Sequence, residues 1–93
     1  MTSRMSDQQS PRIEFPCDYP IKIVGENRAD FITKVVEVTR RHAPEVTLAQ
    51  VRVRNSREGN YASVTITIRA TGEAQLKRLH ADLQTYAAVR LVL

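Results

Sequence analysis

The sequence lacks several kinds of residue on which common protein classes depend. It has no tryptophan, one cysteine, three glycines, and only three tyrosines and two phenylalanines among 93 residues. A single cysteine excludes a disulfide scaffold, and three scattered glycines cannot form a glycine-rich phosphate loop. No apolar run approaches the roughly 18 residues that a transmembrane helix needs. A chain of this length forms one domain, and its core has to be built from aliphatic side chains.

Residues 1–12 are polar and contain proline, and we expect them to form a flexible tail before a single domain at residues 13–93. The tail has no apolar segment of the kind found in a secretory signal. Together with the lone thiol, this predicts a cytoplasmic protein. Acids and bases balance within residues 1–14, so the formal net charge of +4 belongs to the folded part.

Six segments show the periodicity of regular secondary structure. The predicted strands and helices are, in chain order, strand 20–25, helix 28–43, strand 50–55, strand 61–70, a helix after Thr71 whose apolar stripe reaches Ala87, and strand 89–93. This order predicts an α+β, ferredoxin-like βαββαβ fold. Right-handed crossovers then give a four-stranded antiparallel sheet in the order 4-1-3-2, with both helices on one face.

Two helices cover one face of such a sheet, and strand alternation predicts which side chains lie on the other face. Of ten positions predicted there, five are basic and none is acidic. We predict these five as a ligand or partner surface: Lys22, Arg52, Arg54, Arg69 and Arg90. The same alternation predicts Val92 on the uncovered face and Leu91 and Leu93 on the covered face.

Three interpretations of this basic face remain open: a solvated surface, a surface for self-association or a protein partner, and binding of nucleic acid or another polyanion. The RNA-recognition motif has the same topology, but it stacks bases on aromatic side chains of its central strands. This chain has Lys22, Val24 and two threonines at those positions. We therefore expect a protein partner or a homodimer, with weak nucleic-acid binding as the alternative and no membrane contact.

No catalytic or metal-binding pattern is present in the sequence. Cys17 is followed by Asp18, whose negative charge disfavours a reactive thiolate. For neither histidine does the sequence identify a further residue that would orient it as the base of a catalytic triad. CxxC and HxxxH spacings are missing, so we expect no metal, no cofactor and no enzyme activity. A small-ligand loop is predicted at Glu26, Asn27 and Arg28, where backbone N–H groups at the start of a helix can donate to an anion. The alternative is that Asn27 simply caps the helix.

Residues 15–25 (FPCDYPIKIVG) closely resemble the opening of the YbeD-like proteins, a bacterial family of unknown function. The similarity continues through the strand at 52–54, the hairpin at 56–61 and the last strand, and it covers residues 13–93. It implies a small cytosolic protein similar to ACT regulatory domains, which bind amino acids beside metabolic enzymes. Family genes often lie near that of a lipoyl transferase, which implies a link to lipoate metabolism.

The loop at residues 25–28 lacks the Pro-Gly turn at which ACT domains bind their effectors. Residues and resemblance together predict a non-catalytic regulatory or protein-interaction module.

Overall fold

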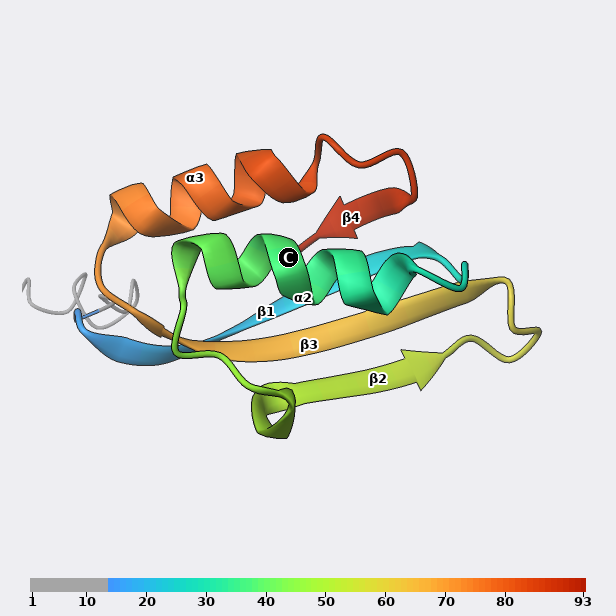
Figure 1. Ribbon diagram of the computed structural model, residues 1–93, viewed down its shortest axis with the longest axis horizontal. Coiled ribbons are helices and arrows are strands. Elements are labelled where there is room, and N and C mark those ends of the chain that lie inside the picture. The colour runs from blue at the N-terminus through green and yellow to red at the C-terminus, as the bar shows by residue number, and fades with distance from the viewer. Residues whose placement is uncertain (1–13) are drawn as a thin grey trace, which may run out of the picture.

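The computed structural model describes residues 14–93, which form one sheet and two α-helices (Figure 1). The predicted tail at residues 1–12 lies outside the described residues. The elements are, in chain order, β1 (Cys17–Glu26), α2 (Phe31–His42), the 3-10 helix η1 (Leu48–Gln50), β2 (Val51–Asn55), β3 (Tyr61–Ala70), α3 (Glu73–Leu83) and β4 (Val89–Val92).

All neighbouring strands of the sheet are antiparallel, and their order is β2-β3-β1-β4. This is the predicted order 4-1-3-2 counted from the opposite edge. Both helices lie side by side on the same face of the sheet (Figure 1). The predicted α+β ferredoxin-like fold is therefore confirmed.

The core lies between the two helices and the covered face of the sheet. Its largest fully buried side chains are aliphatic, and they include Ile23 of β1, Ile66 and Ile68 of β3, and Leu79 and Leu83 of α3. Burying one such side chain contributes roughly 1.5–3 kcal/mol. Packing of helices on the sheet is therefore the main favourable term in folding, and aliphatic residues supply it without tryptophan.

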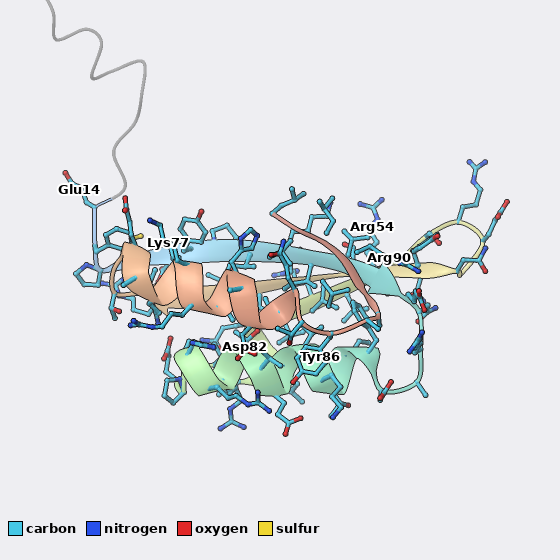
Figure 2. All side chains as sticks on the ribbon, turned by 90° about the horizontal axis from the view of Figure 1, so that it is seen from above. Glu14, Arg54, Lys77, Asp82, Tyr86 and Arg90 are labelled. Carbon is cyan, nitrogen blue, oxygen red and sulfur yellow. The ribbon has the colours of Figure 1, made fainter. Side chains whose placement is uncertain are left out.

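Side-chain hydrogen bonds join the helices to each other and to β4. His42 Nε2, at the end of α2, lies 2.9 Å from Oδ2 of Asp82, which is placed between the two helices in Figure 2. Gln75 Nε2 donates to the His42 carbonyl at 2.7 Å. His80 Nε2 lies 2.9 Å from the carbonyl oxygen of Val92. Both histidines thus have structural partners.

Both helices are shorter than predicted. The helix α2 begins at Phe31 because the Asn27 side chain donates to the Gly59 carbonyl, in the β2–β3 hairpin, at 2.8 Å and does not cap a helix. Asp30 occupies the N-cap position without a side-chain capping bond. The helix α3 ends at Leu83, before the last residues of its predicted apolar stripe.

The end of the last strand, at residues 91–93, has the opposite facing to the predicted one. Val92 is opposite Ile23 of β1 and is 6% exposed, whereas Leu91 is opposite Val24 and is 48% exposed. Directly opposite residues share a face of the sheet, so Val92 lies on the covered face and Leu91 and Leu93 on the other. A register shift in the β1–β4 pairing interrupts the ladder. The predicted facing of residues 91–93 was therefore wrong, whereas Val89 is opposite Gly25 on the covered face as predicted.

Candidate functional site

We call the sheet face turned away from the helices the open face. The register of the strands places the following residues on it: Asp18, Pro20, Lys22, Val24 and Glu26 of β1; Arg52 and Arg54 of β2; Tyr61, Ser63, Thr65, Thr67 and Arg69 of β3; and Leu91 and Leu93 at the end of the chain. Figure 2 shows Arg54 extending from the side of the sheet opposite the helices. Arg90, at the register shift, reaches this face through its bond to Glu26.

Two acidic residues lie on the open face, which corrects the prediction that it has none. β1 runs from Cys17 to Glu26, beyond both ends of its predicted span, so alternation brings Asp18 and Glu26 onto this face. Asp18 is directly opposite Arg69, and Asp18 Oδ1 lies 3.3 Å from Arg69 Nη1. Arg69 is thus paired, and it lies about 14 Å along β3 from Thr65, apart from the other cations.

Glu26 is bound by two arginines. Arg28 Nε donates to Glu26 Oε1 at 2.9 Å, and Arg90 Nη2 donates to Glu26 Oε2. The hydrogen bond from Arg28, together with that from Arg90 and the charges of both, lowers the pKa of Glu26 against an opposing effect of desolvation. Arg90, like Arg69, is therefore not a free cation.

The predicted small-ligand loop is cross-linked by its own contacts. Asn27 donates from its backbone N–H to the Asn60 carbonyl at 3.0 Å and from Nδ2 to Gly59, while Glu26 and Arg28 pair with each other. The structure thus brings the three residues together, but their polar groups bind one another and the hairpin. Ligand binding by this loop stays a prediction.

The lowered pKa of Glu26 predicts a loss of stability in acid. The carboxyl pKa is lower in the folded chain than in the unfolded one, so its stabilising contribution is complete at neutral pH and is lost as the pH falls through the folded-state pKa. In a 13C NMR titration, the Glu26 carboxyl should have a midpoint below the ordinary glutamate value, and Arg28→Ala should raise that midpoint. The control is Arg78→Ala on α3. An unchanged midpoint in Arg28→Ala would contradict the cause assigned to the shift.

The other three cations of the predicted surface lie together. Lys22 and Arg52 are both opposite Thr65 and therefore flank it, and Arg54 lies two residues along β2 from Arg52. None of the three is in an ion pair within residues 14–93. At the hairpin end of the open face, a shallow hollow is lined by residues that include Lys22, Arg54, Arg57 and Tyr61. Arg57 was not predicted for this surface, because alternation places only strand residues.

Two exposed leucine side chains on the Lys22 side of the open face were also missed. Leu93 is 63% exposed, and its backbone exchanges two hydrogen bonds with Lys22, of 3.2 and 2.8 Å. Leu91 is opposite Val24, two residues farther along β1. The open face thus changes from apolar at β4 to basic at β2. The available signal was the run at 89–93, which is apolar at both parities, so part of it had to face outward whatever the register.

Within residues 14–93, no group of three or more His, Cys, Asp or Glu side chains is placed to hold a metal ion. Cys17 is half-buried and lies opposite Ala70 in the β1–β3 ladder. No helix in this part of the chain has the length and hydrophobicity needed to cross a membrane.

Residues 10–93 match the model of a family described as "Protein of unknown function (DUF493)". A curated protein from Azotobacter vinelandii, named "UPF0250 protein", is 46% identical over 89 residues, which cover 95% of this chain and 97% of the relative. A protein of the same name from Hahella chejuensis is 41% identical over 88 residues, with 95% and 97% covered.

Solved structures of similar fold include the protein HP0495 from H. pylori, with a TM-score of 0.65 and 14% identity over 95% of this chain and 92% of that one. The ACT domain from GTP pyrophosphokinase of Chlorobium tepidum has a TM-score of 0.63 at 19% identity, covering 82% of this chain and 84% of that one. At these identities the similarity establishes the fold, which is ACT-like.

Proposed function

Because the chain belongs to the DUF493 family of proteins of unknown function and has an ACT-like fold, we propose that it is a non-catalytic, regulatory protein-interaction module whose partner binds the open face. One observation carries this proposal. On the open face, the exposed Leu93 lies beside Lys22 with Leu91 nearby at the β4 edge, and Arg52 and Arg54 lie across the two central strands at the β2 edge. Lys22, Arg52 and Arg54 have no ion-pair partner within residues 14–93.

This mixture has the composition of a protein interface. Such interfaces combine a dehydrated apolar centre with polar and charged groups around it, and complementary charges guide the approach of the partner. Leu91 and Leu93 supply apolar area that the domain does not bury itself, and the three cations supply a charge that it does not neutralise. An acidic protein surface with a small apolar patch fits both features.

Nucleic-acid binding is supported less well by the same residues. Only three of the five predicted cations are free of ion pairs in the described chain. The central strands have Lys22, Val24 and two threonines on this face, and the only exposed aromatic side chain of β3 is Tyr61 at its start. A stacking platform for bases is therefore missing from the described open face, while the leucines have no role in binding a phosphate backbone.

Photo-crosslinking from the middle of the open face tests the proposal. The full chain, with p-benzoylphenylalanine at Thr65, is irradiated in cells, and the same probe at Arg78 on α3 serves as the control. We expect protein adducts from position 65 that are absent from position 78. Leu91→Asp should remove them while the far-UV circular dichroism spectrum stays unchanged, because Leu91 is half exposed and faces away from the core.

The adducts also discriminate between the alternatives. An adduct that nuclease removes would replace the proposal by nucleic-acid binding, and the absence of any adduct from position 65 would overturn it. An adduct of twice the mass of the chain would identify the partner as a second copy. A protein that carries or transfers lipoyl groups, if found in the adduct, would support the link to lipoate metabolism. We also propose a cytoplasmic location, which cell fractionation of the tagged chain tests.

A further inference from the structure

The two edges of the sheet differ in how they are protected. β4 forms one edge, and its Val92 carbonyl is occupied by His80 Nε2 at 2.9 Å. β2 forms the other edge, and all of its residues after Val51 are exposed. The Val51 N–H bonds to the Leu48 carbonyl, which closes only the start of β2. An uncovered edge presents backbone donors and acceptors to an added strand.

The register shows which backbone groups of β2 point outward. Lys22 exchanges both of its backbone hydrogen bonds with Leu93, so it faces β4, and the residues next to it in β1 face β3. Alternation along the antiparallel ladders then directs Thr65 of β3 toward Arg52 of β2. The Val53 N–H and C=O consequently point to the outer side of β2, where the described chain has no further strand.

The side chains on the two faces of β2 differ in character. Arg52 and Arg54 lie on the open face, and neither is in an ion pair within residues 14–93. Val53 lies on the covered face but is 45% exposed, because β2 lies at the margin of the helix layer (Figure 1). On this side Leu48 is 74% exposed and lines a groove with Ile32. The edge is therefore basic on the open face, and on the other face Val53 and Leu48 expose apolar area beside a groove that Glu37, Arg40 and Arg41 also line.

This edge is unsuited to pairing with a second copy of itself. In an antiparallel β2–β2 pair centred on Val53, Arg52 of one copy would be directly opposite Arg54 of the other. Centring the pair on Arg52 would place Arg52 opposite its own equivalent, and centring it on Arg54 would do the same for Arg54. Like charges directly opposite each other destabilise a strand pair. A strand that carries acidic side chains has the opposite effect, because each would be opposite an arginine.

We propose that the β2 edge binds an extended segment of a partner protein in which acidic and aliphatic residues alternate. The segment adds a fifth strand, exchanges hydrogen bonds with the Val53 backbone, and directs its acidic side chains to Arg52 and Arg54. Its aliphatic side chains lie beside Val53 and toward Leu48. This inference rests on the proposed interaction function and specifies the chemistry and conformation of the partner.

A peptide of seven residues in which Glu alternates with Val is the direct probe, added at up to millimolar concentration and low salt to the 15N-labelled full chain. We expect slower hydrogen exchange at the Val53 amide and chemical-shift changes concentrated in residues 51–55. The matched peptide with Lys in place of Glu should bind about tenfold more weakly or not at all. A Glu-Val peptide N-methylated on the backbone should lose binding as well, because it cannot donate to the edge.

Charge reversal on the protein completes the test. Arg52→Glu with Arg54→Glu should exchange the preference, so that the Lys-Val peptide binds and the Glu-Val peptide does not. Arg78→Glu on α3 changes the net charge in the same direction at a remote site and should leave the preference unaltered. Both replaced arginines are exposed, so the fold is expected to persist in every variant.

Three results would overturn the inference: no binding of the Glu-Val peptide, equal binding of the Lys-Val peptide, or shift changes around Leu91 and Lys22 with unchanged exchange at Val53. In each case, adducts from position 65 that depend on Leu91 would still support the proposed function, with the partner held by the open face alone. If those adducts are absent while the peptide protects Val53, the proposed use of the open face fails and edge binding stands. The two experiments therefore fail separately.

Discussion

Replacing Gly25 with alanine is expected to lower the thermal midpoint of unfolding by more than about 10 °C, which corresponds to roughly 2–3 kcal/mol in a domain of this size. Gly25 is buried, and a Cβ atom there would overlap the carbonyl oxygen of Ala88 and the ring of Phe31. The Ala88 oxygen accepts a hydrogen bond from the Glu26 N–H at 2.8 Å. Phe31 begins α2 and is 2% exposed. Neither neighbour can therefore move without loosening an element of the fold.

Gly72→Ala is the matched control for this substitution. Gly72 precedes α3, and a Cβ atom there meets no atom within 4 Å. Both substitutions reduce the freedom of the unfolded chain by the same amount, which by itself stabilises slightly. Differential scanning calorimetry should therefore show a large loss for Gly25→Ala and almost none for Gly72→Ala. Equal midpoints for the two variants would contradict the close packing of Gly25 against Ala88 and Phe31.

The fold could be predicted because its signals are local and repeated. Six segments with the right period in the right order admit one common topology, and right-handed crossovers decide the strand order. The helix starts were less predictable, because an asparagine has more than one use. Asparagine often caps helices, but the Asn27 side chain donates to the carbonyl of Gly59, 32 residues away. Local sequence patterns contain no information about this hydrogen bond between distant residues, so they could not predict it.

The sequence predicts which basic residues lie on the open face, but it does not predict which of them form ion pairs. Lys22, Arg52 and Arg54 lie on the open face as the alternation of β1 and β2 requires. Arg69 and Arg90 form ion pairs with acidic residues that are 51 and 64 residues away in sequence. Those partners came onto the open face through an extension of β1 at both ends. Which cations remain available is thus decided by tertiary pairing.

The facing of β4 was the largest error, and it changes the character of the open face. The run at 89–93 is Val-Arg-Leu-Val-Leu, so both of its alternating sets contain aliphatic residues and the pattern does not select one. The structure selects Val92 through its pairing with Ile23 and a register shift nearer the start of the strand. Hydrophobic alternation specifies a register only when one set is polar.

This facing makes opposite predictions for two neighbouring residues, Leu91 and Val92. Val92→Asp should reduce the free energy of unfolding by about 4 kcal/mol, because it removes buried apolar area and places a carboxyl group in the core without a partner. A domain of this size has only about 4–12 kcal/mol in total, so much of the variant should be unfolded. Leu91→Asp should reduce the free energy of unfolding by only about 1 kcal/mol, since Leu91 is 48% exposed and buries only part of its side chain.

Urea denaturation followed by circular dichroism measures both values. The reverse ranking, with Leu91→Asp unfolded and Val92→Asp stable, would restore the simple alternation and return Val92 to the open face. The expected ranking has a consequence for function as well. A folded Leu91→Asp domain with an intact core allows any loss of adducts from position 65 to be assigned to the open face, because the substitution changes only what that face presents to a partner.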